Sequence, residues 1–121
     1  MVEKKSARQN MVASEIRRVL SEYLLRNPIA DFEVNTSFIC ITNVNISPCL
    51  QFAKVYIVSL SSEASNEKCL AFLKRYISKL KRCLGANIRL KFIPDIEIFI
   101  DDTWERAEKI ESMLKKISSS S

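Results

Sequence analysis

The residue types that most often perform catalysis or bind metals are scarce in this sequence. Histidine is absent from the 121 residues, which removes the commonest general base and the commonest metal ligand. Glycine occurs once, so neither common type of glycine-rich phosphate loop is present. No serine or cysteine stands in the context of a nucleophile elbow. The sequence therefore predicts a protein that is not an enzyme and uses no cofactor.

The cysteines are spaced too widely for a compact metal site. No two of them form a Cys-x-x-Cys pair, which is the first requirement of a zinc ribbon or a thioredoxin-like site. Without histidine, no mixed Cys/His site can form either. In a reducing cytosol we expect no metal and four free thiols that act as small apolar residues, at Cys40, Cys49, Cys69 and Cys83.

Neighbouring acidic residues leave one catalytic alternative open. Asp101 with Asp102, and Asp95 with Glu97, could bind Mg²⁺ or act as an acid and a base. However, Asp101 and Asp102 precede a predicted helix, where carboxylates cap free N–H groups and complement the helix dipole. We favour the capping role and keep a metal-assisted hydrolase built on Asp95, Asp101 and Asp102 as a minor alternative.

Basic residues are segregated from acidic ones along the chain. The net charge of +5 favours an anionic partner, nucleic acid before a membrane surface. Residues 68–91 contain eight basic residues and no acid, whereas residues 95–111 contain seven acids and two bases. Ammonium groups and arginine forks both suit phosphate, although an ordinary solvated helix face would also be basic. We expect nucleic acid to be bound by Lys74, Arg75, Lys79, Lys81, Arg82, Arg89 and Lys91, with Arg17 and Arg18 as second choices.

Two segments of helical periodicity predict the elements that position these side chains. In the first, a capping box of Ser6 and Gln9 opens a helix that ends near Asn27, before Pro28. In the second, apolar residues recur at spacings of three and four from residue 70 to 84, which indicates one amphipathic helix. Gly85 follows directly, where a left-handed helix stop belongs.

Three segments predict strands, and one more predicts a helix. Residues 38–46 and 50–60 are rich in β-branched residues and should pair as an antiparallel hairpin. Alternation of apolar and charged residues from 89 to 101 predicts a half-buried strand, in which Pro94 marks a bulge or an edge position. Residues 102–117 predict a last helix, with Trp104 as a packing anchor.

The order α-β-β-α-β-α predicts an α+β domain of two layers with a three-stranded sheet. We expect one domain over residues 1–121, with short flexible tails at 1–5 and 118–121. The helices should cover one face of the sheet and leave Lys54, Tyr56, Arg89 and Glu97 on the other. Tyr56 could stack on a base there, but we favour packing against neighbouring side chains. Because no secretory signal or membrane-length apolar run is present, we expect a cytoplasmic protein.

Several segments, in this order and spacing, resemble the ribosome-binding factor A family over about residues 6–117. They are VASEIRRVL at 12–20, ITNVNIS at 41–47, AKVYI at 53–57 and IRLKFIPDIEIFID at 88–101. The resemblance implies a KH-like domain of the bacterial type with a kinked second helix. It also implies binding to the immature small ribosomal subunit, help with late maturation of its ribosomal RNA, no enzymatic activity, a role sharpened in the cold, and a monomer off the ribosome.

Two departures from the family pattern bear on the RNA contact. Tyr76-Ile77-Ser78 stands where the family has an Ala-x-Gly kink, and Cys49 replaces an acidic residue common in the hairpin turn. Because the Gly-x-x-Gly loop of ordinary KH domains is missing, we expect weak sequence-specific binding to free single strands. Recognition should depend on folded RNA and on neighbouring ribosomal proteins. The alternative is a protein–protein adaptor of the same fold that uses a sheet edge or the acidic last helix and does not touch RNA.

Overall fold

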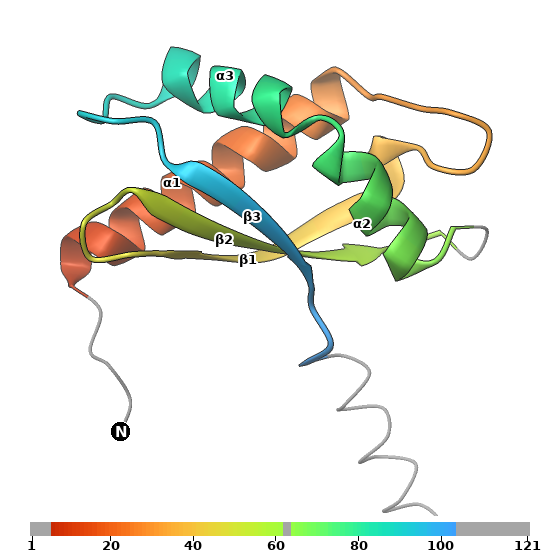
Figure 1. Cartoon of the computed structure of the whole chain (residues 1–121), viewed down its shortest axis with the longest axis horizontal. Helices are drawn as coiled ribbons and strands as arrows, with labels where there is room; N and C mark the ends of the chain where they lie inside the picture. The colour runs from red at the N-terminus through yellow and green to blue at the C-terminus, as the bar shows by residue number, and fades with distance from the viewer. Residues whose placement is uncertain (1–5, 62–63, 104–121) are drawn as a thin grey trace, which may run out of the picture.

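The computed structural model of the chain describes residues 6–61 and 64–103 and consists of a mixed three-stranded sheet with helices on one face (Figure 1). The predicted C-terminal helix with Trp104 and both predicted tails lie outside the described residues. The elements in chain order are α1 (Ala7–Arg26), a 3₁₀ turn η1 (Thr36–Phe38), β1 (Ile39–Ile46), β2 (Phe52–Ser59), α2 (Asn66–Lys74), α3 (Ile77–Asn87) and β3 (Asp95–Ile100).

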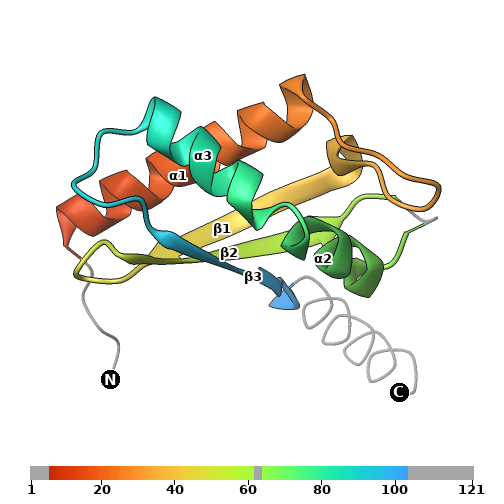
Figure 2. The same cartoon turned by 45° about the horizontal axis from the view of Figure 1, so that its top comes forward.

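The sheet has the strand order β1-β2-β3. β1 and β2 form the predicted antiparallel hairpin, whereas β3 pairs in parallel with β2 after the helical crossover that a parallel pair requires. Figure 2 shows α1 and the α2–α3 segment together on the same side of the strands. The α+β, KH-like, two-layer fold predicted from the sequence is therefore confirmed. None of the described helices is long and apolar enough to cross a membrane.

Helix α1 forms as its sequence predicts. The Ser6 hydroxyl accepts a hydrogen bond from the Gln9 backbone N–H, and the Gln9 side chain accepts one from the Ser6 N–H, which completes the capping box. One face of the helix is buried, including Ile16 and Leu20, both with no exposed area. The helix ends at Arg26, just before Pro28 prevents its continuation.

The second helical segment is broken in two rather than continuous. The backbone leaves α-helical geometry at Tyr76 (φ −114°, ψ 16°), and the N–H groups of Arg75 and Tyr76 bond back only three residues, to Phe72 and Leu73. The rings of Phe72 and Tyr76 lie 5.0 Å apart across this break. The kink that the family resemblance implies is thus present without glycine. Apolar periodicity could not reveal it, because Leu73 and Leu80 remain buried on both sides.

Gly85 is not the left-handed stop that the sequence predicted. It lies inside α3, which continues to Asn87, and its φ is not positive. A Cβ atom at this position would meet Cδ1 of Ile93 at 2.6 Å, so glycine allows the loop after α3 to lie close against the helix.

We predict that Gly85→Ala leaves the free energy of unfolding unchanged or raises it by up to about 0.5 kcal/mol. Alanine is favoured over glycine in a helix interior by roughly 0.5–1 kcal/mol, and the Ile93 side chain, 48% exposed, can rotate away from the new methyl group. Urea unfolding followed by circular dichroism measures the change. A loss of more than about 1 kcal/mol would mean that the Ile93 side chain cannot move away from the new methyl group.

Strand β3 begins later than predicted. Residues 88–94 form a loop, and the ladder with β2 starts where the Asp95 N–H donates to the Gln51 carbonyl at 2.8 Å. Pro94 has no N–H to contribute to the ladder, which explains why pairing begins only after it. Consequently Arg89 and Lys91 lie on this loop and not, as expected for Arg89, on the open face of the sheet beside Lys54 and Glu97.

Candidate nucleic-acid interface

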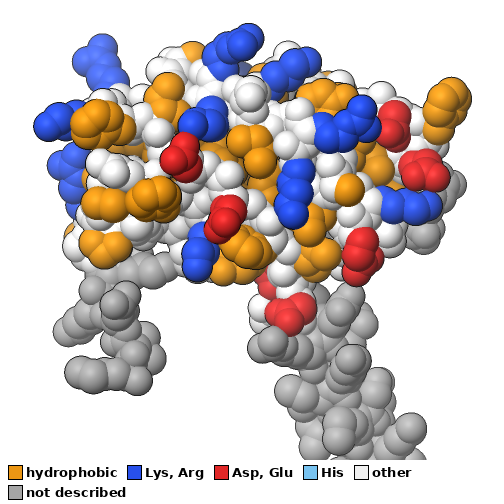
Figure 3. Space-filling model, viewed as in Figure 1, with side chains coloured by type: hydrophobic (Ala, Val, Ile, Leu, Met, Phe, Trp, Pro, Cys, Tyr) orange, Lys and Arg blue, Asp and Glu red, His pale blue; other side chains and the backbone are white. Residues whose placement is uncertain are grey.

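The predicted RNA-binding residues lie on α2, on α3 and on the loop 88–94. Figure 3 shows basic side chains spread over the helical layer and at the end of the molecule that carries this loop. On α3, Leu80 and Leu84 are buried toward the sheet, while Lys79 and Arg82, three residues apart, are exposed on the opposite side. The exposed members of the set are Lys74, Arg75, Lys79, Arg82, Arg89 and Lys91, and Lys81 is half-buried.

Some of these cations are already engaged by carboxylates. Lys81 Nζ lies 2.6 Å from Oδ1 of Asp95, an ion pair that joins α3 to the first residue of β3. Arg75 lies near Asp31, whose pKa is lowered chiefly by backbone hydrogen bonds from Val34 and Glu33 and further by the charge of Arg75. Lys81 and Arg75 therefore have less free charge to offer a phosphate than their neighbours.

The remaining five cations are free of acidic partners in the described ranges 6–61 and 64–103. Lys79 Nζ lies 5.4 Å from the Tyr76 ring centroid, and Lys91 Nζ lies 5.6 Å from that of Phe92, contacts that leave the charge of each lysine in place. We name these residues the free cation set, and it consists of Lys74, Lys79, Arg82, Arg89 and Lys91.

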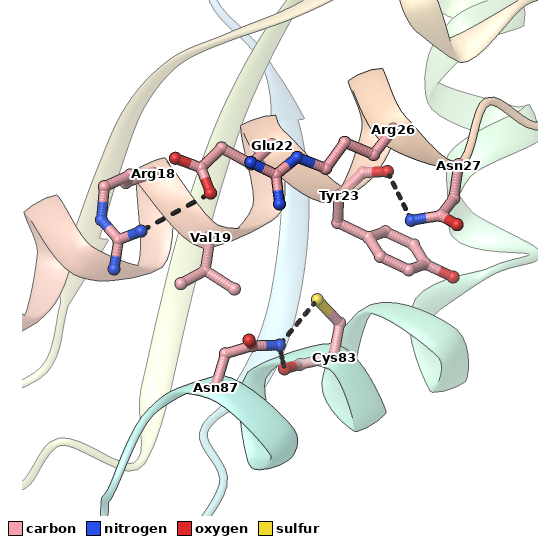
Figure 4. Close-up of a pocket in the computed structure, with 8 residues that line it drawn as sticks. All are labelled: Arg18, Val19, Glu22, Tyr23, Arg26, Asn27, Cys83 and Asn87. Carbon is pink, nitrogen blue, oxygen red and sulfur yellow. Dashed lines mark hydrogen bonds and ion pairs between the residues drawn. The ribbon is translucent and has the colours of Figure 1, made fainter.

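The second-choice residues on α1, Arg17 and Arg18, form contacts within the fold. The Arg17 Nε–H donates to the Ile41 carbonyl at 3.3 Å, and Arg18 pairs with Glu22 at 3.6 Å. Figure 4 shows Arg18 beside a pocket of about 220 Å³ between α1 and α3, where Asn87 donates to the Cys83 carbonyl. The structure thus places Arg18 next to α3 but gives it an acidic neighbour.

The acidic residues considered for a hydrolase are not brought together. Asp95 begins β3 and Asp101 follows its end, a separation of about 20 Å along an extended strand. No cluster of three or more potential metal ligands occurs among the described residues. Asp101 instead accepts hydrogen bonds from the Thr103 N–H at 2.9 Å and from the Thr42 hydroxyl. The helix that it was expected to cap lies outside the described residues from Trp104 onward. Hydrogen bonds from Thr103 and Thr42 lower the pKa of Asp101.

We predict that Asp101→Asn lowers the free energy of unfolding by about 0.5–1 kcal/mol at neutral pH, since the amide keeps only one acceptor oxygen for the two bonds and loses the negative charge. The pKa of Asp101 is lowered in the folded state, so its contribution is present above the unfolded value of about 3.9 and is lost as pH falls through the folded value. Urea unfolding of both proteins should therefore differ at neutral pH and converge in strong acid. A difference that persists in strong acid would mean that the ionised Asp101 carboxylate is not the source of the lost stability.

The cysteines are free, as predicted, but their surroundings differ. Cys69 is buried in the core, and burial raises the pKa of Cys83. Cys49 is exposed in the β1–β2 turn, where a hydrogen bond with Ser47 lowers the pKa of its thiol. Cys49 therefore does not act as the small apolar core residue that was expected.

Aromatic residues of the open sheet face pack against each other. Tyr56 stands opposite Phe99 in the β2–β3 register, and their rings stack with centroids 5.6 Å apart. Lys54 Nζ lies 5.8 Å from the Phe99 centroid. The prediction that Tyr56 packs against its neighbours is confirmed.

Exposed aromatic residues near the basic loop were not identified as functional from the sequence. Phe92 was assigned to the apolar side of a strand, yet its side chain is 55% exposed. Phe52, at the start of β2, is 56% exposed. The signal that could have located Phe92 is Pro94, because a strand that begins only after proline leaves the preceding residues in a loop.

Comparison with known proteins identifies the family. The sequence profile of the family described as ribosome-binding factor A matches residues 8–114. A ribosome-binding factor A from Ruegeria sp. is 40% identical over 103 residues, which cover 85% of this chain and 78% of the relative. The crystal structure of the Thermus thermophilus protein superposes with a TM-score of 0.63 at 20% identity and covers 76% of this chain and 94% of its own.

A further match is to a protein of this fold placed on a ribosomal particle. A homology model of Thermus thermophilus ribosome binding factor A, fitted into a cryo-electron-microscopy map of its complex with the 30S subunit, matches this chain with a TM-score of 0.59 at 20% identity. The match covers 74% of this chain and 90% of the other. With the family profile matched over most of its length and a relative at 40% identity, this chain belongs to the ribosome-binding factor A family.

Proposed function

We propose that this protein is a non-enzymatic, cytoplasmic assembly factor that binds the immature small ribosomal subunit and assists late maturation of its ribosomal RNA, with a role sharpened in the cold. The observation that carries the proposal is the free cation set, five basic side chains on one helical segment and its loop without acidic partners among the described residues. The 30S complex of the Thermus thermophilus protein supports the same partner.

RNA is the component of the subunit that best suits this surface. Exposed lysine and arginine side chains that are not neutralised within the fold release counterions when they meet phosphates, which favours binding. Such a protein acts by binding one RNA conformation better than another, and so it shifts the population toward the matured form without bond chemistry. We propose that it does so as a single domain that is monomeric off the ribosome.

Co-sedimentation of the purified protein with small ribosomal subunits across a salt series tests the proposal. We expect association with small subunits but not with complete ribosomes, and an affinity that falls with salt by roughly 0.7–0.9 logarithmic units per phosphate contact and per tenfold rise in salt. No association at low salt would remove the proposed function while leaving the fold and family in place.

The second candidate, a protein adaptor without RNA contact, is favoured by a surface at the opposite end of the sheet. A pocket of about 220 Å³ there includes Asp31 and Glu33, and exposed apolar side chains lie at Phe32 (108%), Phe38 (53%) and Leu60 (67%). Acidic groups around apolar side chains would suit a basic protein segment rather than RNA. Binding to the subunit that is insensitive to loss of the free cation set would support this adaptor.

A further inference from the structure

Three segments that are far apart in the sequence meet at one end of the molecule. Figures 1 and 2 both show the start of α1, the β1–β2 turn and the loop 88–94 at this end. Two hydrogen bonds hold them there, from Gln9 Nε2 to the Ile46 carbonyl at 3.2 Å and from the Asp95 N–H to the Gln51 carbonyl at 2.8 Å. The loop is also held against α3, because the Ile93 side chain lies over Gly85.

Large apolar side chains are exposed at this end although the core is complete without them. Phe52 is 56% exposed, Phe92 is 55% exposed and Ile93 is 48% exposed. Phe52 stands opposite Asp95 in the sheet register, and the two loop residues precede Asp95 by three and two positions in the chain. Exposed aromatic residues that are concentrated on one held loop and the strand beside it indicate a binding surface rather than scattered surface residues. We name Phe52 and Phe92 the aromatic platform.

Exposed cations lie on the elements that meet at this end of the molecule. Arg89 and Lys91 are exposed on the same loop, and Arg8 is exposed at the start of α1. Lys91 Nζ lies 5.6 Å from the Phe92 ring centroid, so charge and ring are presented together. The acid beside Phe52 in the register, Asp95, already pairs with Lys81 at 2.6 Å. A cationic aromatic surface is complementary to a ligand that carries both flat rings and negative charge.

We propose that the aromatic platform stacks unpaired bases of folded RNA while Arg89 and Lys91 hold the flanking phosphates. This rests on the proposed function and specifies which RNA is recognised. Bases within a duplex are stacked on each other and cannot reach an aromatic side chain, whereas bases in loops and bulges can. Stacking of this kind tolerates any base, which agrees with the absence of a Gly-x-x-Gly loop for close reading of a defined sequence.

Fluorescence anisotropy with three RNA probes tests the platform. The probes are a hairpin with an unpaired loop, the same hairpin with abasic sites throughout that loop, and a blunt duplex of equal length. We expect the double substitution Phe52→Ala and Phe92→Ala to weaken binding to the intact hairpin by at least about 25-fold and to leave the other two probes unchanged, since two stacked bases are lost and each contributes at least roughly 5-fold. Phe92→Trp should retain binding to the intact hairpin.

Phe32→Ala supplies the matched control. Phe32 is a fully exposed phenylalanine, more exposed than Phe52 and Phe92, but it lies at the opposite end beside Asp31 and Glu33, so its loss should leave all three probes unchanged. An equal loss of binding to the intact and abasic hairpins, or no loss to either, would overturn the aromatic platform.

The same variants in co-sedimentation separate this inference from the proposed function. If the unsubstituted protein associates with small subunits but the double variant binds all three probes as the unsubstituted protein does, the platform is wrong and the proposed function stands. If the unsubstituted protein does not associate with subunits, yet its hairpin binding depends on Phe52 and Phe92, the proposed function is wrong and the platform stands.

Discussion

Replacing Lys74, Lys79, Arg82 and Arg89 together with glutamine should weaken association with small ribosomal subunits by about 1,000-fold at physiological salt. Each charge-assisted contact with phosphate contributes roughly 1 kcal/mol, so four lost contacts amount to about 4 kcal/mol. The dependence of affinity on salt should also become shallower, by about one logarithmic unit for each lost contact. Co-sedimentation across a salt series measures both quantities.

The four substitutions should leave the fold intact. All four side chains are exposed, and none forms an ion pair within the described part of the chain. Changes at such surface positions usually alter stability by less than about 0.5 kcal/mol each. A loss of binding would therefore reflect the missing charges rather than unfolding, which a circular dichroism spectrum of the variant would verify.

A second set of four substitutions removes the same number of charges from side chains that the fold already engages. Lys68 pairs with Glu33 at 3.4 Å, and the partners of the other three residues are described above. We expect glutamine at all four positions to weaken association by less than about 10-fold, because these cations have little free charge to offer. Equal losses from the two sets would mean that net charge alone determines binding. The control set is Arg18, Lys68, Arg75 and Lys81, each of which has a carboxylate partner or neighbour.

The layers of the fold could be predicted from the sequence because hydrophobic period and capping chemistry are local. Ser6 and Gln9 mark the start of α1 and were sufficient to place it. The break at Tyr76 could not be predicted from periodicity, since the buried face continues from Leu73 to Leu80 while only the backbone between them changes. The Gly85 prediction was wrong for a related reason. Gly85 was expected to adopt a left-handed backbone conformation, whereas its missing side chain leaves room for Ile93 of the following loop.

The basic residues of the candidate site could be predicted from the sequence, but which of them pair with acidic residues could not. The run of basic residues from 68 to 91 is visible in the sequence, and most of it is exposed in the structure. Which cations remain free depends on tertiary contacts, such as the pairing of Lys81 with Asp95 across fourteen positions. The aromatic platform escaped notice because Phe92 shares the alternating pattern of β3, although the strand begins only at Asp95.

We predict that Leu84→Ala lowers the free energy of unfolding by about 3 kcal/mol, within the range of roughly 2–5 kcal/mol typical of buried leucines. Leu84 is 1% exposed and belongs to the core that α3 shares with α1 and the sheet. Truncation leaves a cavity that this close-packed layer cannot fill. Urea unfolding followed by circular dichroism measures the change, and the thermal midpoint should fall by about 10–15 °C.

Leu25→Ala is the matched control, because Leu25 is also a helical leucine but is 66% exposed on α1. We expect it to change stability by less than about 0.5 kcal/mol. Since Leu84 holds α3 in place without being exposed itself, its variant should bind small subunits normally at temperatures where it remains folded. Reduced binding by folded Leu84→Ala protein would mean that the free cation set requires the exact position of α3. Normal binding would mean that the exposed charges themselves are sufficient, so that stability and recognition reside in opposite faces of the same helix.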